Sequence, residues 1–456
     1  MNDMTYIMSG ASMALKPGMG KKQDDGTYLS LQDDDIFSGM VADTIKEFDS
    51  GVNYEIMFNA YNEVNAMKNY FAKHNYFGTK WHADSGGLQM ITLGKEITEE
   101  LKDEVYKVQA QYSSYAMCFD ELPIHVIGEL KGKQSRIDLS GRLYIEEWAE
   151  QRALNTGNNV KRQIELFREM KSDSKVFLIC QGNNTADFVD FYNTAMSVIP
   201  KEYYSSMAGI ALSAACTGLG RLEAIQMLGS YRFMDIPKEI GNKLHVLGFG
   251  SIKRLWPLLL LKESGYIDRD ITFDSSSHAI KPILGEFRDE DGIDYKFGKK
   301  PDAVPEPRCQ QGNTVQLDIL LGNKFLYKKY GHILKQYYNM DFEEFYEIVA
   351  KKDVYTSERY NLSCKRQVTT NLYHRWLKAF ESCFRFGKEL VEVRQDMREG
   401  KFDSGIPAMN DLINVKTKED FVRWFKGFKN VMPSNPIIRC KTLEDVEKNT
   451  IAALPI

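Results

Sequence analysis

Short apolar runs that finish in polar residues or glycine alternate with longer segments of helical period through the first two thirds of the chain. The longer segments include 140–155, 184–199 and 218–233, whose apolar positions recur every three or four residues. The eight short runs are 5-TYIMSGAS-12, 53-NYEIMFNAY-61, 80-KWHADSGG-87, 115-YAMCFDE-121, 175-KVFLICQGN-183, 206-SMAGIALS-213, 244-LHVLGFG-250 and 270-DITFDSSS-277. This alternation predicts parallel strands joined by right-handed crossovers.

Eight strand and helix units are the number that closes a (β/α)8 barrel. We therefore predict an α/β fold, with a TIM barrel over residues 1–304. The polar residues that finish the strands would then meet at one mouth, where active sites of this fold lie. A doubly wound open sheet is the alternative, but the chain has neither the G-x-G-x-x-G turn expected of many such folds nor a P-loop.

The character of the sequence changes near residue 300. The segment 300–313 is rich in Pro and polar residues, which is typical of a linker or an irregular excursion. We predict a mainly helical C-terminal region over 305–456. Its segments 324–338 and 365–390 interleave aromatic residues with Lys and Arg. This pattern is compatible with nucleic-acid contact, although packed helices with solvated faces produce it more often.

Composition narrows the class of protein. The formal net charge of −4 over 456 residues leaves no global basic excess, so any nucleic-acid contact must come from a local patch. Seven scattered cysteines do not suggest a disulfide framework. The longest apolar run, 255–261, falls well short of the ~18 residues that a spanning helix needs. We expect a cytoplasmic protein outside the membrane.

Three aspartates stand where apolar runs finish: Asp84, Asp120 and Asp274. Any one of them has an ordinary explanation as a turn former or helix cap. Three carboxylates directed at one barrel mouth favour a functional site over three separate turns or caps. A pair of carboxylates across a glycosidic bond, one as nucleophile and one as acid and base, is the usual device for chemistry at a sugar C1.

The segment 84-DSGGLQ-89 resembles the D-S-G-G-F-Q signature of the tRNA-guanine transglycosylases, which exchange guanine in a polynucleotide for a 7-deazaguanine. Further segments resemble blocks of this family in the same order between about residues 50 and 280. They are 117-MCFDELP-123 (M-x-F-D-E/D), 180-CQGN-183 (V-Q-G-G), 209-GIALS-213 (G-L-A-V-G), 247-LGFGS-251 (M-G-V-G) and 273-FDSSSH-278, which is closest to the F-D-S-A form of the archaeosine branch.

The resemblance implies a role for each catalytic position. Asp274 would be the nucleophile that attacks C1′ of the target nucleotide, expels guanine and forms a covalent sugar intermediate. Asp84 would protonate the departing guanine and deprotonate the incoming base. Two displacements at C1′ would preserve the β configuration. The target nucleotide must leave any duplex or loop before the nucleophile can reach it.

The resemblance also implies a pocket for the flat base. Gly86 and Gly87 would let the backbone approach the ring closely. Asp120 would accept hydrogen bonds from the ring N–H and the exocyclic amine, while Gln181 and the Gly209 backbone would address the ring carbonyl. Asn59 would orient Asp84. The base-binding residues implied in this way are Asn59, Ser85, Gly86, Gly87, Gln89, Asp120, Gln181, Gly182 and Gly209.

Departures from the family pattern indicate which base enters the site and whether the protein binds zinc. Ala214 stands where the bacterial enzymes carry a Glu that recognises an aminomethyl group, which favours the neutral 7-cyano-7-deazaguanine (preQ0). The family's C-x-C-x-x-C plus His zinc site is broken: Cys309 falls near the first ligand, but Gln311 and Thr314 replace the next two and His332 is the nearest later His. A structural zinc normally needs four ligands, so we predict no metal and no cofactor.

The absence of the zinc-bearing insertion bears on whether the substrate is DNA or tRNA. In the family this insertion helps present tRNA, so its replacement by an unrelated helical segment resembles the DNA-guanine transglycosylase branch. Relatives of that branch, often phage-encoded, place 7-deazaguanines in DNA to resist restriction. The resemblance therefore implies a glycosyltransferase, acting on double-stranded DNA with a flipped guanine in the host cytoplasm. A homodimer is left open.

Three alternatives remain from the sequence. An archaeosine- or queuosine-type tRNA enzyme would use the same chemistry on another polynucleotide. A non-catalytic partner subunit of a transglycosylase would be a binding module, but such relatives tend to lose the pocket or nucleophile residues, and all three aspartates are present here. A glycoside hydrolase on the same barrel would explain the carboxylates and leave the Gly-rich pocket unexplained.

Overall fold

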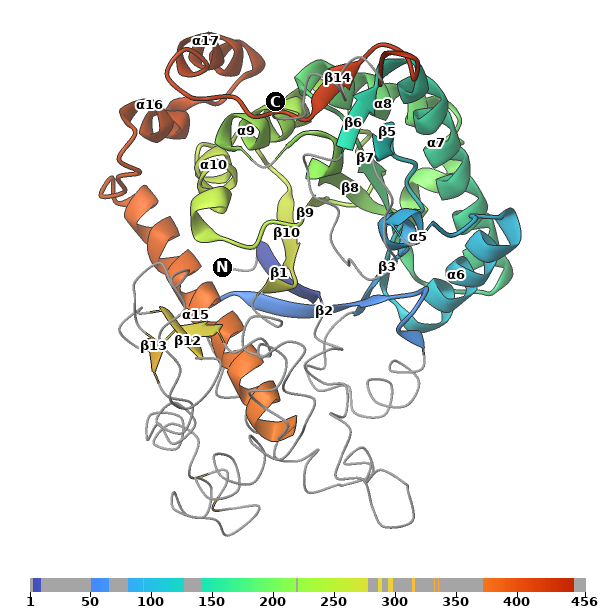
Figure 1. Ribbon diagram of the computed structural model, residues 1–456, viewed down its shortest axis with the longest axis horizontal. Coiled ribbons are helices and arrows are strands. Elements are labelled where there is room, and N and C mark those ends of the chain that lie inside the picture. Colours follow the sequence, from blue (N-terminus) through green and yellow to red (C-terminus); the bar gives the residue numbers. More distant parts are fainter. Residues whose placement is uncertain are drawn as a thin grey trace.

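Eight parallel strands close into a barrel in the computed structural model of this chain (Figure 1). They are β1 Met4–Ser9, β2 Asn53–Asn59, β3 Trp81–Asp84, β4 Tyr115–Met117, β7 Lys175–Cys180, β8 Met207–Ser213, β9 Lys243–Leu247 and β10 Asp270–Ser275. The order around the barrel is β1-β10-β9-β8-β7-β4-β3-β2. Each strand begins within one residue of the start of one of the eight apolar runs, and most of the strands end two to four residues before their run does, so the predicted (β/α)8 architecture is confirmed.

The structure describes only part of the chain. The described residues are 3–9, 51–64, 81–92, 94–126, 142–218, 220–277, 286–288, 294–297, 314–315, 332, 335 and 372–446.

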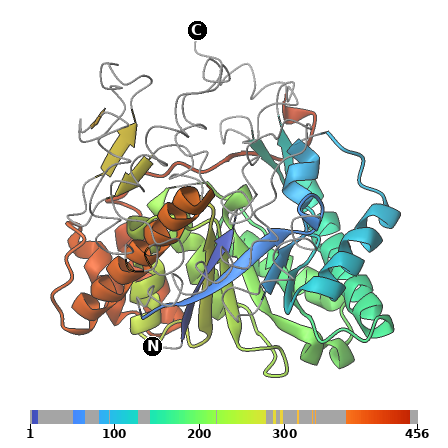
Figure 2. The same cartoon turned by 90° about the horizontal axis from the view of Figure 1, so that it is seen from below.

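Helices surround the strands on the outside of the barrel, as the side view shows (Figure 2). They are α6 Glu99–Tyr112, α7 Glu146–Glu169, α8 Thr185–Ser197, α9 Arg221–Gly229 and α10 Ile252–Glu263, with the short α5 Gly87–Thr92 after β3 and the 3-10 turns η4 Lys201–Ser206, η5 Ala214–Cys216 and η6 Ser230–Phe233. The strand β8 is buried at every position, as expected for a parallel strand covered on both faces. The helix α8 begins where the Asn184 side chain accepts hydrogen bonds from the Ala186 and Asp187 amides.

The segment 140–155 is only partly the helix that its period predicts. Residues Arg142–Ile145 form the strand β6, which pairs antiparallel with β5 (Ile124–Val126) and parallel with β14 (Ile438–Cys440). Leu143, Tyr144 and Ile145 are buried in this small sheet, and α7 begins immediately after it. A short apolar run directly before a helix is compatible with either structure, which explains the error.

The C-terminal residues pack against the barrel. The helix α15 (Leu372–Arg398) lies along α10, and its buried Arg394 forms ion pairs with Asp3, just before β1, and Glu263 of α10. After it come α16 (Pro407–Asn410), η10 (Asp411–Asn414) and α17 (Lys418–Phe428). A further small sheet is formed by β11 Glu286–Arg288, β12 Asp294–Phe297 and β13 Thr314–Val315. The predicted boundary at 304/305 falls outside the described residues and stays a prediction.

Two further features concern the described residues. Within the described ranges, none of the helices combines the length and the apolar character that crossing a membrane requires. The cysteines in these ranges, Cys118, Cys180, Cys216, Cys383 and Cys440, are buried free thiols.

Candidate active site

Asp274 lies near the carboxyl end of β10 and is held by neighbours from two adjoining strands. Its Oδ2 accepts a hydrogen bond from the Ser9 hydroxyl at 2.8 Å, and its Oδ1 accepts one from the Gly248 backbone N–H at 2.8 Å. The side chain is only 14% exposed. Burial pushes the pKa of Asp274 upward, but contacts with His245, Gly248 and Ser9 outweigh it, so the pKa lies below its ordinary value. Asp274 is therefore a carboxylate at neutral pH.

His245 lies one layer below Asp274 in the barrel interior. Its Nε2 is 3.4 Å from Oδ1 of Asp274, and its Nδ1 is 2.9 Å from the Thr272 hydroxyl. The ring is fully buried. A Thr272 hydroxyl that donates to Nδ1 places the ring proton on Nε2, facing the Asp274 carboxylate.

Asp84 ends β3 and pairs in register with Asn59 at the end of β2. Asn59 donates from Nδ2 to Asp84 Oδ2 at 3.3 Å. Burial, followed by the nearby charges of Asp120 and Asp274, raises the pKa of Asp84 to about 7, although the Gly86 and Ser85 amides partly oppose the shift. The predicted contact between Asn59 and Asp84 is present.

The glycine turn after Asp84 is shaped by the side chain of Asn59. Gly86 has a φ of +76°, and a Cβ there would lie 2.8 Å from Asn59 Oδ1 and 2.9 Å from the Tyr61 Cβ. Asn59 also donates to Gln89 Oε1 and accepts the Tyr61 amide through Oδ1. Glycine is thus required at position 86 both for its backbone angle and for space.

The other residues of this turn lie beside the same mouth. The Gly87 amide donates to the Ser85 hydroxyl at 3.3 Å, and Ser85 is buried. A Cβ at Gly87 would touch the Phe119 ring at 3.4 Å, so the backbone packs closely on that ring. Gln89 is exposed near the start of α5.

Asp120 follows β4 and is hydrogen-bonded to Gln181, which follows β7. Gln181 donates from Nε2 to Asp120 Oδ2. Burial raises the pKa of Asp120 to about 6, and the Gln181 hydrogen bond limits this shift. Gln181 is buried, and its carbonyl Oε1 has no hydrogen-bond partner in the described part of the protein. A buried unsatisfied acceptor beside a carboxylate is suited to a ligand that carries N–H groups.

Two of the predicted pocket glycines serve packing. A Cβ at Gly182 would lie 2.7 Å from the Phe188 amide nitrogen, so the absence of a side chain here lets α8 pack closely on this segment. Gly209 does not lie at the mouth with the other predicted site residues. It pairs with Lys243 at the amino end of β9, and a Cβ there would lie 1.9 Å from the Lys243 carbonyl oxygen. Ser213, four residues and about 13 Å further along β8, occupies the mouth instead.

Three residues around Asp274 were not identified from the sequence: Ser9, His245 and Gly248. Each belongs to an apolar run that was recognised as a strand. The period of two along a strand gives the missing signal, because it directs His245 and Leu247 into the barrel, on the same side as Thr272 and Asp274 of the next strand. Ser213 could have been found in the same way, as the last residue of its run.

The predicted loss of zinc lies largely outside the described residues. Cys309 and Gln311 are not described, and Thr314 is described only as part of β13. His332 is exposed. Ala214, the position predicted to favour a neutral incoming base, begins η5 directly after Ser213. The absence of a metal therefore stays a prediction.

Comparison with known proteins gives no assignment: no family model matches the chain, and no curated protein matches it. The charge of Asp274 is one of the causes that raise the pKa of Asp84 to about 7, so the two carboxyl groups lie close enough to interact, while the pKa of Asp274 itself lies below its ordinary value. Such a pair can supply a nucleophile and a general acid in one site. Asp120 and Gln181 add a polar wall on neighbouring strands.

Proposed function

We propose that this protein is a guanine transglycosylase that exchanges guanine in DNA for a 7-deazaguanine through a covalent aspartyl-sugar intermediate. The observation that carries the proposal is the contrast between two carboxyl groups of one mouth. The pKa of Asp274 is held below its ordinary value, whereas burial and like charges raise that of Asp84 to about 7. Carboxyl groups whose pKa values are pushed apart are suited to separate roles as nucleophile and acid.

The first half of the reaction replaces the bond between C1′ and guanine by a bond between C1′ and an Asp274 oxygen. The electron pair of the broken bond stays with guanine, and the proton of Asp84 neutralises the departing base. Hydrogen bonds from Ser9 and Gly248 hold the Asp274 carboxylate in one orientation for this attack. Guanine is a poor leaving group unless it is protonated, which is why the raised pKa of Asp84 matters.

The second half reverses these steps with a new base. The Asp84 carboxylate takes the ring proton of the incoming 7-deazaguanine, whose nitrogen then attacks C1′ and releases Asp274. Each displacement inverts C1′, so two displacements restore the original configuration. Asn59, bonded to Asp84 Oδ2, keeps this carboxyl group directed at the base in both halves.

Recognition of guanine would fall to Asp120 and Gln181. Guanine presents a ring N–H and an exocyclic amine beside its carbonyl oxygen. The Asp120 carboxylate can accept from both N–H groups, and the Gln181 amide can donate to the carbonyl. The unsatisfied Oε1 of Gln181 supports a ligand rich in N–H donors at this wall.

The proposed incoming base, polynucleotide and biological role rest on the sequence. Ala214 in place of an acidic residue favours the neutral 7-cyano-7-deazaguanine as incoming base. The broken zinc pattern and the unrelated C-terminal helices favour DNA over tRNA. Protection of phage DNA from restriction is the role that follows from such a modification. An archaeosine-like tRNA enzyme is the second candidate, because the block around Asp274 most resembles that branch.

Exchange of radiolabelled guanine into duplex DNA and into tRNA tests this proposal. We expect incorporation into DNA by the wild-type protein, none by Asp274→Ala, and loss of label when 7-cyano-7-deazaguanine is added. Nucleoside analysis of that DNA should then reveal the cyano base. Incorporation into tRNA alone would select the tRNA enzyme. Absence of exchange into either polynucleotide would refute the proposal and leave a binding subunit or a glycoside hydrolase to be tested.

A further inference from the structure

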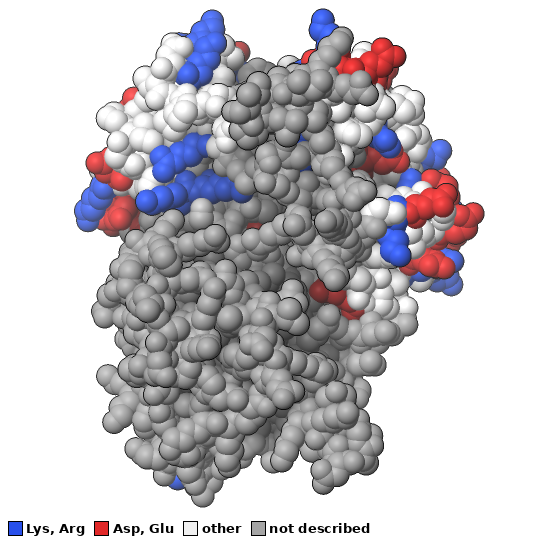
Figure 3. Space-filling view, in the orientation of Figure 1, with Lys and Arg blue, Asp and Glu red and all other residues white. Residues whose placement is uncertain are grey.

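Three cationic side chains beside the mouth have no carboxylate partner among the described residues. Arg221 is the first residue of α9, and Lys253 and Arg254 lie in the first turn of α10. Among the ion pairs of the described residues, none involves these three side chains. In the space-filling view, Lys and Arg side chains lie side by side over this part of the barrel (Figure 3). Positive charge without a protein counter-charge is a reason to look for an anionic ligand.

Arg254 is the least ordinary of the three. Its guanidinium lies 4.7 Å from the centre of the Phe249 ring, and Nη1 is 3.4 Å from the Gly248 carbonyl oxygen. Its Nε is buried without a hydrogen-bond partner in the described part of the chain. Burial lowers the pKa of Arg254, and no acidic group of the described residues offsets this. A guanidinium taken partly out of water without an anion is unfavourable, and a bound anion would relieve that cost.

Arg221 and Trp256 connect the two helix starts. The guanidinium of Arg221 lies 5.5 Å from the centre of the Trp256 ring on α10. The buried Nε1 of Trp256 has no hydrogen-bond partner in the described protein. The nearest carboxylate along α9 is Glu223, which is buried and accepts hydrogen bonds from Ser434 and Asn435. These bonds use Oε1 alone; Oε2 is buried without a hydrogen-bond partner among the described residues, and Glu223 forms no ion pair with Arg221 there.

The cluster is joined to the nucleophile through a single residue. Gly248 donates its N–H to Asp274 Oδ1, and its carbonyl faces Arg254 Nη1. A sugar whose C1′ meets Asp274 carries a phosphate on each side of it, so the backbone of a bound strand must pass close to Gly248. Guanidinium groups are well matched to phosphate oxygens.

We propose that Arg254, together with Lys253 and Arg221, binds the backbone phosphates that flank the target nucleotide. This inference rests on the proposed function, since it names the part of the polynucleotide that the cluster holds. It assigns the α9 and α10 side of the mouth as the path of the attacked strand. The contacts are with phosphate and position the strand without reading its sequence.

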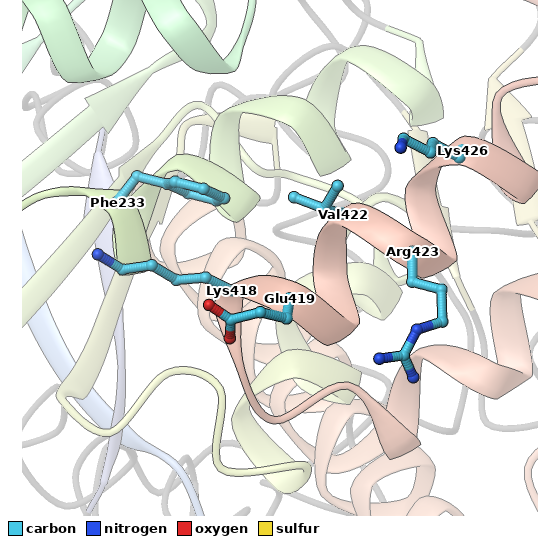
Figure 4. A pocket seen from close by; sticks show the side chains of 6 residues that line it. All are labelled: Phe233, Lys418, Glu419, Val422, Arg423 and Lys426. Atoms are coloured by element: carbon cyan, nitrogen blue, oxygen red, sulfur yellow. The ribbon is translucent and has the colours of Figure 1, made fainter.

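A rival basic surface lies on α17, beside a groove lined by Phe233, Lys418, Glu419, Val422, Arg423 and Lys426 (Figure 4). Its charge is mixed, because Glu419 lines the groove and Arg423 pairs with Asp420. Phe421 of α17 packs against Gly229, the last residue of α9, where a Cβ would lie 1.9 Å from the ring. Because α9 begins at the mouth and runs away from it, α17 lies near the opposite end of the barrel and is poorly placed to hold the attacked strand.

Binding to a duplex of A·T pairs only, followed by fluorescence anisotropy at several salt concentrations, tests the phosphate contacts without any guanine. We expect Lys253→Gln and Arg254→Gln each to flatten the slope of log affinity against log salt by about 0.9 for every phosphate that is no longer neutralised. Arg254→Lys should keep most of the slope. Arg221→Gln combined with Arg254→Gln should flatten it further. Lys175→Gln, an exposed charge at the amino end of β7, is the matched control and should leave the slope unchanged.

The outcomes separate this inference from the proposed function. Variants that bind the duplex with the wild-type affinity and slope would overturn the phosphate site, even if the wild-type protein exchanges labelled guanine. A wild-type protein that does not bind the duplex would overturn it as well. A reduced slope in a protein that exchanges no guanine would uphold the phosphate site while the proposed function fails. Lys253 is exposed, so Lys253→Gln gives a result even if Arg254→Gln unfolds.

Discussion

His245 Nε2 lies 3.4 Å from Oδ1 of Asp274, beneath the carboxylate in the interior of the barrel. The imidazole is fully buried, and its other nitrogen is fixed by the Thr272 hydroxyl at 2.9 Å. Because the ring cannot turn away without breaking the hydrogen bond to Thr272, its Nε2 stays directed at the carboxylate. The relationship helps to explain why a largely buried aspartate keeps a pKa below its ordinary value.

Replacement of His245 should therefore impair Asp274 without removing it. We expect His245→Phe to slow covalent adduct formation roughly 10-fold, because the Asp274 carboxylate loses a polar neighbour whose Nε2 lies 3.4 Å from it. The pH below which the reaction fails should rise, because Asp274 becomes easier to protonate. His245→Gln, which can still donate an N–H, should retain more activity. Single-turnover rates between pH 4 and 8 measure both effects, and an unchanged rate and pH profile in His245→Phe would show that the contact is only structural.

The pKa values of Asp84 and Asp120 predict a bell-shaped dependence of kcat/KM on pH. Asp120 must be ionised to accept N–H groups, so base binding is lost as the pH falls through about 6. Asp84 must be protonated to release guanine, so the rate falls as the pH rises through about 7. We expect an optimum between these values. Asp120→Asn should remove the acidic limb and move the basic limb to lower pH, because the charge of Asp120 helps to raise the pKa of Asp84. A wild-type profile that is flat from pH 5 to 8 would contradict both roles.

Much of the fold and part of the site could be predicted from the sequence, for physical reasons that differ between residues. Strands of a parallel barrel are buried on both faces, so runs such as 207–213 stand out as continuous apolar segments. Asp84, Asp120 and Asp274 are found because they interrupt such runs at their ends. The contact between Asp84 and Asn59 follows from the register of β2 and β3.

What could not be predicted depends on distances between strands. His245 is an inconspicuous residue inside an apolar run, and only the pairing of β9 with β10 places it below Asp274. Gly209 begins a run that resembles a pocket strand, yet it meets Lys243 at the end of the barrel away from the mouth. The lack of an ion-pair partner for Arg254 among the described residues is likewise invisible in the sequence, because it depends on which carboxylates approach the guanidinium in space.

Substitution of Gly86 tests how tightly Asn59 and Tyr61 enclose the glycine turn. We expect Gly86→Ala to lower the free energy of unfolding by about 2–4 kcal/mol, because the alanine Cβ would meet Asn59 Oδ1 and the Tyr61 Cβ in addition to the strained φ of +76°. Gly94→Ala is a matched control: it has a φ of +62° and open space, so it should cost only about 1–2 kcal/mol. Urea denaturation of both variants measures the difference. Equal losses in the free energy of unfolding would mean that the Asn59 side chain moves aside without an energetic penalty.

Replacement of Asp120 by Asn should weaken binding of the incoming base. The ring N–H and amine lose an anionic acceptor, and a hydrogen bond to a charged group contributes about 1.5–3 kcal/mol, so we expect a ten- to hundredfold loss in affinity. The fold should persist, since Asp120 is bonded to Gln181 at the edge of the mouth rather than in the core. Calorimetric titration with 7-cyano-7-deazaguanine gives the affinity, and an unchanged value would remove Asp120 from the pocket.

The covalent bond between Asp274 and the sugar is the central claim. Asp274 has the properties that a nucleophile needs, namely a carboxylate held by Ser9 and Gly248 at a barrel mouth. The most direct test incubates the protein with guanine-containing duplex DNA, withholds any incoming base, and looks for a denaturant-resistant adduct whose attachment site is mapped by mass spectrometry. We predict an adduct on Asp274 in the wild-type protein and none in Asp274→Ala, with guanine released in equal amount. An adduct that persists in Asp274→Ala, or guanine exchange near the wild-type rate in that variant, would contradict the mechanism.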